Sequence, residues 1–231
     1  MRAHANAAAL LRHGAGHWMS RYTWPVARRY VIAPLALGVP LALRGHRTGR
    51  ALLALAAMIA AFFRDPDRPL PENPSLVYAA ADGLITSVEH DVAEPWLPGG
   101  KGTRVSVFLS LVNVHVNRSP IAGTLTRSDE LGGSAVPAFL AKADTNRRNR
   151  LALSGAAGPV VVVQVAGMLA RTITNWAGVG DRVVAGQRLG IIHFGSRTDV
   201  LLPSGAAEVL VPEGARVRGG VTPIARLRAQ G

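Results

Sequence analysis

The chain has 231 residues, enough for one substantial domain or two small ones, and it carries a formal net charge of +12. It contains no cysteine, which excludes disulfides, thiolate metal sites and cysteine nucleophiles. The positive excess is almost entirely arginine, since Lys101 and Lys142 are the only lysines, and neither lies in an apolar run of the kind that activates a lysine for Schiff-base chemistry.

The first 50 residues are strongly basic, with eight arginines and no acidic residue. Two apolar runs of 13 residues each, 31–43 and 51–63, flank a basic loop. A bilayer crossing needs about 20 apolar residues, so we expect neither run to span alone. The pattern favours a membrane-associated helical hairpin in residues 1–64, with arginines at the phosphates and aromatic residues before it. The alternative is a helical pair buried in a soluble core.

A Pro-rich stretch ends the hairpin, and we interpret residues 65–75 as an extended linker. Short apolar runs and glycine turns then fill residues 76–231. This texture predicts a mostly β, α+β fold, namely a compact β-sandwich or barrel. Residues 178–192 have a turn-strand-turn pattern like that of lipoyl carrier domains, but no lysine follows Lys142, so carrier chemistry is excluded. Residues 132–150 predict a short helix followed by a polar loop.

Few residues of the β-rich part are suited to chemistry. His115 alternates with valines and is flanked by Asn113 and Asn117, which predicts three polar side chains on one strand face and a histidine held in one tautomer. The alternative is a structural histidine. Asp82 precedes a glycine between two apolar runs and is read first as a hairpin turn. His193 lies close to a Gly-Ser pair between two strand-like runs.

Other site types are weakly supported. Arg147 and Arg148 lie in a polar segment that is either a solvated loop or a cradle for a phosphate or carboxylate. The isolated histidines and aspartates form no metal-ligand spacing. No phosphate-binding loop, dinucleotide fingerprint or nucleophile elbow occurs in the sequence.

Several stretches together resemble the phosphatidylserine decarboxylase proenzyme family in its short bacterial or archaeal-like form. In chain order they are FFRDPDRPLP, YAAADGLITSV, VFLSLVNVHVNRSPIAG, VVVQVAGMLARTITNW and GVGDRVVAGQRLGIIHFGSRTDVLLP. They cover roughly residues 60–203, and the most specific of them is RLGIIHFGSRTDVLLP.

The resemblance implies that the chain cuts itself between Gly195 and Ser196. The products would be a β chain (1–195) and an α chain (196–231) that stay associated. Ser196 would become a pyruvoyl group, a self-generated covalent cofactor that needs neither a metal nor pyridoxal phosphate. This group would form a Schiff base with the substrate amine and accept electrons as phosphatidylserine loses CO2 to give phosphatidylethanolamine.

The resemblance also suggests roles for other residues. His115 matches a family histidine of the active site, and Asp82 matches an aspartate that supports self-cleavage through a histidine. Longer members carry a second histidine where this chain has Arg118, so either His115 serves both steps or the proton routes differ. His193 stands where arginine is common. Arg118, Arg147, Arg148 and His193 are the candidate substrate-binding residues.

The expected partner is phosphatidylserine in the cell membrane, bound by a peripheral or monotopic enzyme at the cytoplasmic face, with no nucleic acid. Homo-oligomerisation is left open. Two alternatives remain. One is a soluble pyruvoyl-dependent amino-acid decarboxylase, which would not need an arginine-rich apolar hairpin. The other is a non-enzymatic basic β module that binds membranes, in which Gly-Ser is merely a turn.

Overall fold

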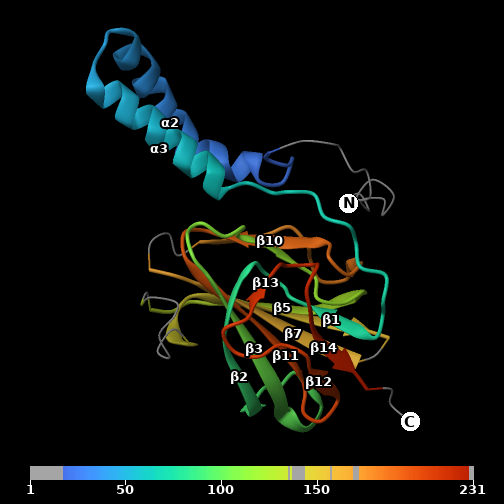
Figure 1. Cartoon of the computed structure of the whole chain (residues 1–231). Helices are drawn as coiled ribbons and strands as arrows, with labels where there is room; N and C mark the ends of the chain where they lie inside the picture. Colours follow the sequence, from blue (N-terminus) through green and yellow to red (C-terminus); the bar gives the residue numbers. More distant parts are fainter. Residues whose placement is uncertain (1–17, 135, 137–143, 157, 169–171, 229–231) are drawn as a thin grey trace. The chain divides into compact units, whose positions relative to one another are not determined.

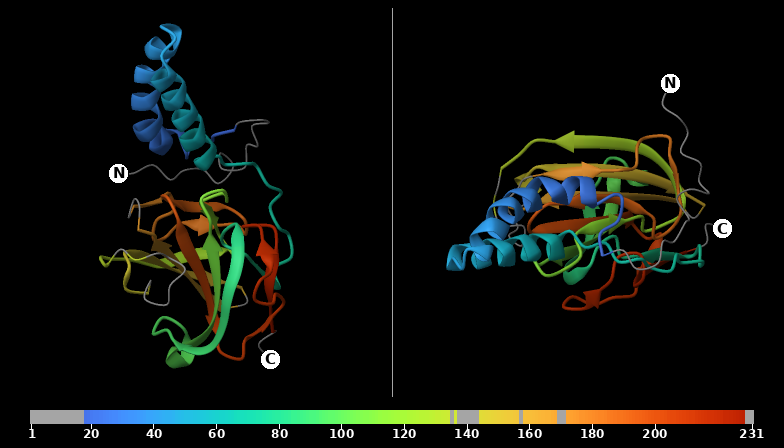
Figure 2. Two further views of the ribbon diagram at one scale, coloured as in Figure 1. Left: turned by 60° about the vertical axis from the view of Figure 1, so that its left-hand side comes forward. Right: turned by 90° about the horizontal axis from the view of Figure 1, so that it is seen from above.

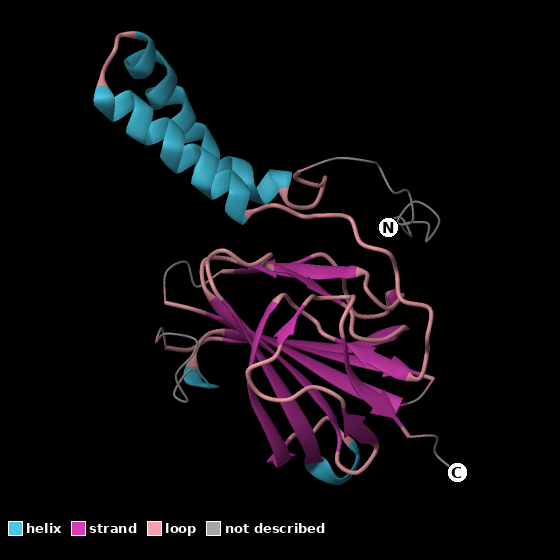
Figure 3. Cartoon of the chain, in the orientation of Figure 1, coloured by secondary structure: helices cyan, strands magenta, loops and turns pink. Residues whose placement is uncertain are grey.

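The computed structural model describes residues 18–134, 136, 144–156, 158–168 and 172–228 (Figure 1). The chain forms two compact units. One is helical and comprises residues up to 60 together with 64–67, and the other is β-rich and comprises residues 61–63 together with those from 68 onward. In the described part, helix is confined to the two N-terminal helices and a few short turns (Figure 3).

The helical unit is built from α2 (Trp24–Leu43) and α3 (Arg47–Phe62). Between them Gly45 has a φ of +84°, in the left-handed region that favours glycine. A second glycine lets the helices approach closely, since a Cβ added at Gly49 would lie 2.2 Å from the backbone nitrogen of Ala42. The predicted helical hairpin is confirmed.

Helix α2 is longer than the apolar run that predicted it. It begins at Trp24, with proline in its first turn, and its 20 residues make it long and apolar enough to cross a membrane by length and composition. The run 31–43 is thus part of a longer helix, because the residues that precede it are also helical, and the expectation that neither run spans alone stays a prediction. Several large apolar side chains of the hairpin are exposed: Ile32, Leu35, Leu37, Val39, Leu43, Leu55 and Met58.

The β-rich unit contains one long sheet and two small ones, all with antiparallel pairing. The long sheet has the strand order β13 (Arg216–Val217), β2 (Gly83–Ala93), β3 (Lys101–Leu109), β11 (Ser196–Pro203), β7 (Gly158–Ala166), β6 (Arg148–Gly155), β5 (Gly123–Leu131) and β9 (Arg182–Val183). The small sheets are β1 (Leu76–Tyr78), β14 (Pro223–Leu227) and β12 (Ala207–Val209), and β4 (Val116–Arg118), β10 (Arg188–Ile192) and β8 (Ile173–Asn175). One turn, η1 (Pro98–Gly100), precedes β3.

The long sheet is strongly curled, and the views in Figures 1 and 2 show its strands wrapping around a common interior. The apolar core fills this interior and draws on β3, β7 and β11, with residues such as Val105, Val107, Val162, Val200 and Leu202. The mostly β, α+β class expected from the short apolar runs is confirmed.

Strand β11 lies at the centre of the long sheet, between β3 and β7, and all eight of its residues are buried. Its side chains alternate between two faces. The inner face, which carries Val200 and Leu202, packs on the main core and also carries Ser196 and Thr198. The outer face carries Leu201, which packs in a second, smaller apolar cluster, together with Arg197 and Asp199.

Some local expectations need correction. The predicted hairpin at Asp82 is not formed, because β1 and β2, which flank it, belong to different sheets. Strand β6 begins at Arg148, inside the segment read as a polar loop. Much of the helix expected within 132–150 lies outside the described residues, which omit 135 and 137–143.

Candidate active site

The turn between β10 and β11 has an unusual backbone. Phe194 has a φ of +52° and Gly195 a φ of +77°, so two consecutive residues are left-handed immediately before Ser196. Glycine adopts this region readily, whereas for phenylalanine it costs about 1–2 kcal/mol. The next residue is fixed firmly, because Ser196 pairs with Leu109 of β3 and Ala166 of β7. The strained residue is therefore Phe194, directly before the Gly195–Ser196 peptide.

The Ser196 side chain is fully buried, and its Oγ has no hydrogen-bond partner among the described residues. Two nearby groups, Thr198 Oγ1 and Asn117 Nδ2, are likewise buried without a hydrogen-bond partner among the described residues. Each unsatisfied buried polar group costs about 1–3 kcal/mol, so such groups call for an explanation. A role in the reaction would explain why such unfavourable groups are retained.

The carbonyl group of Gly195 packs against another glycine. A Cβ added at Gly167, directly after β7, would lie 2.0 Å from the Gly195 carbonyl oxygen. Any side chain at Gly167 would therefore displace this carbonyl. At Gly195 itself an added Cβ would meet no described atom within 4 Å, so the left-handed backbone rather than crowding is what favours glycine there.

His115 is fully buried, and its Nδ1 lies 3.0 Å from the backbone oxygen of Asn113. A carbonyl oxygen can only accept, so Nδ1 carries a proton in this contact, and the neutral ring has its lone pair on Nε2. The backbone oxygen of His115 accepts from the Ile192 nitrogen at 3.3 Å, which ties the histidine to the end of β10. His115 and the strained turn are thus neighbours.

The predicted run of three polar side chains on one strand was wrong for both Asn113 and His115, which precede the strand that carries Asn117. Strand β4 starts at Val116, and Asn113 lies in a turn where its Oδ1 accepts from the nitrogen and Oγ of Ser110. The histidine tautomer is set by a backbone carbonyl rather than by a flanking amide side chain.

A row of buried amides crosses the interior beside Thr198. Gln164, the cross-strand neighbour of Thr198, donates from Nε2 to Asn117 Oδ1 at 2.8 Å. Its Oε1 accepts from Asn149 Nδ2 at 2.9 Å, and Asn149 in turn accepts from Ser128 Oγ at 3.4 Å. This row fixes the Asn117 amide and leaves its Nδ2 as the unused donor.

Asp82 is held by a residue that the sequence analysis did not single out. Its carboxylate oxygens accept from Arg68 Nη1 at 2.5 Å and Nη2 at 2.7 Å, and from the Gly219 nitrogen at 2.8 Å. Among the described residues, Asp82 accepts these hydrogen bonds from Arg68 and Gly219 and none from His115. The role of Asp82 in self-cleavage stays a prediction.

The four candidate substrate-binding residues lie in different surroundings. His193 is buried next to the strained turn, and its Nε2 lies 3.1 Å from Thr174 Oγ1. Arg118 is also buried and donates to the backbone oxygen of Gly186 at 3.0 Å. Arg147 is half-exposed beside Glu130. Arg148 lies beside a pocket of about 240 Å³ whose lining includes Arg197, so it belongs to the outer face. The structure therefore brings only His193 next to Ser196, and the substrate-binding roles stay predictions.

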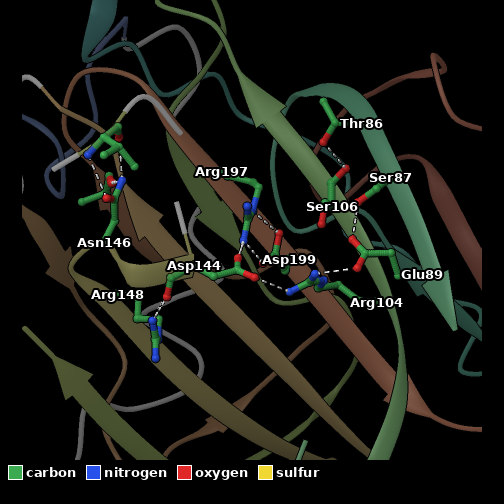
Figure 4. Close-up of polar contacts among 12 residues, drawn as sticks. Thr86, Ser87, Glu89, Arg104, Ser106, Asp144, Asn146, Arg148, Arg197 and Asp199 are labelled. Atoms are coloured by element: carbon green, nitrogen blue, oxygen red, sulfur yellow. Dashed lines mark hydrogen bonds and ion pairs between the residues drawn. The ribbon is translucent and has the colours of Figure 1, made fainter. Parts of the chain in front are cut away.

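The outer face of β11 carries an ion-pair network (Figure 4). Arg197 binds Asp199 through Nε at 2.8 Å and Nη2 at 2.9 Å, and it also binds Asp144. Arg104 reaches Asp144 at 3.2 Å and Glu89 at 2.7 Å. Burial acts to lower the pKa of Arg197, but the charge and hydrogen bonds of Asp199 outweigh it and raise the pKa. The arginine is thus firmly held in its charged form.

The sequence analysis singled out the Gly-Ser pair and His115 but missed residues whose neighbours in the fold are distant in the chain. Among these are Arg68, Gly167 and Thr198. Arg68 was quoted within FFRDPDRPLP and assigned to the extended linker, and its burial at 5% exposure depends on distant residues, which a local pattern does not indicate.

A family model described as phosphatidylserine decarboxylase matches residues 55–225. Three similar relatives are each named phosphatidylserine decarboxylase proenzyme. The one from Symbiobacterium thermophilum is 44% identical over 212 residues, which is 90% of this chain and 95% of that protein. The one from Carboxydothermus hydrogenoformans is 37% identical over 200 residues, 86% and 93% of the two chains. The one from Gluconobacter oxydans is 46% identical over 183 residues, 78% and 81%.

Proposed function

Because this chain belongs to the phosphatidylserine decarboxylase family, we propose that it is a proenzyme that cuts itself between Gly195 and Ser196 and then converts phosphatidylserine to phosphatidylethanolamine and CO2. The observation that carries this proposal is the pair of left-handed residues directly before a buried serine whose hydroxyl has no hydrogen-bond partner among the described residues. The relatives' names supply the substrate.

In the proposed cleavage the Ser196 oxygen forms a bond to the Gly195 carbonyl carbon, and the peptide C–N bond breaks. The hydroxyl proton passes through a base to the departing nitrogen, which gives an ester. Loss of the Ser196 α-proton and of the ester oxygen then leaves a carboxylate on Gly195 and a dehydroalanine. Hydrolysis of the dehydroalanine releases ammonia and yields a pyruvoyl group, whose carbonyl accepts electrons when a carboxylate is lost.

His115 is the best-placed candidate for the base in this cleavage. Its neutral tautomer presents a lone pair on Nε2, and its backbone oxygen accepts a hydrogen bond from the nitrogen of Ile192, four residues before Ser196. Asp82 and Arg68 form a partly buried pair that ties the start of β2 to Gly219. We propose that this pair supports self-cleavage by holding these segments in position, rather than by a direct hydrogen bond to His115.

The helical unit supports a lipid rather than a soluble substrate. Its exposed large apolar side chains make a surface of the kind that binds membranes, and the arginines 28, 29, 44, 47 and 50 suit anionic headgroups. We therefore propose attachment to the cell membrane through the hairpin. Apolar insertion should resist high salt, so quantitative release of the protein from membranes by salt alone would contradict insertion.

The deciding experiment is the intact mass and denaturing electrophoresis of the purified chain and of Ser196→Ala. We expect the unaltered chain to give two fragments, the smaller with a blocked N-terminus, and Ser196→Ala to stay whole and inactive because no hydroxyl remains. Ser204→Ala, at an exposed residue directly after the same strand, is the matched control and should cleave normally. Two fragments from Ser196→Ala would overturn the assignment.

A second measurement tests the product of the cleavage. Hydroxylamine, or borohydride with substrate, should abolish decarboxylation and label the small chain, since the proposed carbonyl is at its N-terminus. Labelling of Lys101 or Lys142 would instead indicate lysine chemistry.

A further inference from the structure

Two phenylalanines at the end of α3 belong to the β-rich unit and are buried there, Phe62 at 5% and Phe63 at 0% exposure. The Phe62 ring stacks on Phe194, with centroids 4.6 Å apart and planes 23° apart. The Phe63 ring meets Phe194 edge-on, with centroids 5.8 Å apart and planes 86° apart. We call Phe62 and Phe63 the aromatic clamp.

The clamp holds the residue whose backbone is strained. A left-handed phenylalanine persists only where its surroundings over-determine it, and Phe194 is not a glycine, asparagine or aspartate that would adopt this region easily. Stacked and edge-on rings at these separations are favourable aromatic geometries. The two contacts therefore offset the strain in the turn that precedes Ser196.

Phe62 makes a second contact, with the proposed base. Its ring centroid is 4.1 Å from that of His115, with the planes tilted by 37°. The Phe62 ring therefore contacts both Phe194, which directly precedes Gly195, and His115, the histidine that would take the Ser196 proton. Phe63 adds an edge contact to His193 at 5.6 Å.

We infer that Phe62 is a positioning residue for self-cleavage, which holds Phe194 in its left-handed conformation and fixes the His115 ring beside the turn. This inference rests on the proposed function. It also means that α3 contributes residues both to the helical unit and to the processing apparatus.

The test follows cleavage of the full-length chain with time after synthesis. We expect Phe62→Ala to slow the appearance of the two fragments by about tenfold, equivalent to about 1.4 kcal/mol in the barrier. Phe62→Leu, which retains volume but not stacking, should fall between Phe62→Ala and the unaltered chain. Val179→Ala, which shortens an apolar side chain that is 61% exposed in the β-rich unit, is the control and should cleave at the normal rate. Cleavage of both Phe62 variants at the normal rate would overturn the inference.

A double-mutant comparison separates positioning from a general structural role. In a Phe194→Gly background the turn is accessible without the clamp, so Phe62→Ala should slow cleavage severalfold less than it does in the original chain. An equal slowing in both backgrounds would refute the action on Phe194. If the unaltered chain does not cleave, the proposed function itself fails, and the two outcomes are thereby distinguished.

Discussion

The polar side chains on the two faces of strand β11 differ in whether they have bonding partners. On the outer face Arg197 and Asp199 are bound to each other, and the network continues to Asp144 and Arg104. On the inner face the hydroxyls of Ser196 and Thr198 are buried with no hydrogen-bond partner in the described part of the chain. Because successive side chains point to opposite faces, the strand separates the groups that fix its position from the groups left available for reaction.

This difference suggests a division of labour. Ion pairs and the backbone pairing to β3 and β7 hold β11 in place, so its inner face can retain polar groups that are unfavourable in the folded chain. Proteins commonly retain such unfavourable groups where function requires them. Three changes test this difference between the two faces: Arg197→Ala, Thr198→Val and acid pH.

Arg197→Ala should have the largest effect, because it leaves the buried Asp199 without its bidentate partner. Breaking a buried pair from one side lowers the free energy of unfolding by about 3–5 kcal/mol. The measurement is denaturant unfolding in the Ser196→Ala background, where the chain is expected to remain whole. Arg226→Ala removes an exposed pair with Glu208 at 4.0 Å and should change stability by about 0–1 kcal/mol. Equal losses from the two changes would contradict a structural role for the outer face.

Thr198→Val should have an effect of the opposite sign on stability. It replaces a buried hydroxyl that lacks a partner with a methyl group of similar shape, so unfolding free energy should rise by about 1 kcal/mol. Decarboxylation by the processed enzyme should nevertheless fall, since the hydroxyl is the inner-face group nearest Ser196 along the strand. Thr126→Val is the matched control, because Thr126 Oγ1 donates to the Ala152 oxygen at 3.2 Å, and it should lose stability without losing activity. Unchanged activity in Thr198→Val would remove Thr198 from the site.

Acid should weaken the outer face by a smaller amount. Burial acts to raise the pKa of Asp144, but the hydrogen bond and charge of Arg197 outweigh it, so the pKa lies below its usual 3.8. A carboxyl with a lowered folded pKa contributes stability that is fully present above the unfolded value and is lost as pH falls through the folded value. Urea midpoints of the Ser196→Ala chain should therefore drop below about pH 4, and Asp144→Asn should flatten this drop. An unchanged pH dependence in Asp144→Asn would show that other carboxyls dominate.

The class of fold was predictable because its signals are local. Short apolar runs with glycine turns predicted the β-rich unit, whereas the family resemblance singled out the Gly-Ser pair and His115, which the structure places in neighbouring segments. The partners were not predictable, because they are set by tertiary packing. Asp82 meets Arg68 and Gly219 from opposite ends of the unit, and Phe62 reaches Phe194 across more than half of the chain.

The misreadings have the same physical origin. A dipeptide such as Asp82-Gly83 favours a turn whether the strands on either side pair with each other or diverge into two sheets, as β1 and β2 do. Likewise, a Pro-rich stretch excludes helix but does not exclude burial, and Asp65 and Arg68 are both buried.

The central place of β11 has a consequence for the reversibility of folding. The proposed cut assigns β11 to the small chain, whereas both of its neighbours, β3 and β7, belong to the large one. Before the cut, refolding after denaturation is a unimolecular search. After it, the large chain lacks the middle strand of its sheet until a second molecule supplies it, so recovery should depend on protein concentration. The processed enzyme would thus be held together by the barrier to unfolding more than by an ability to reassemble.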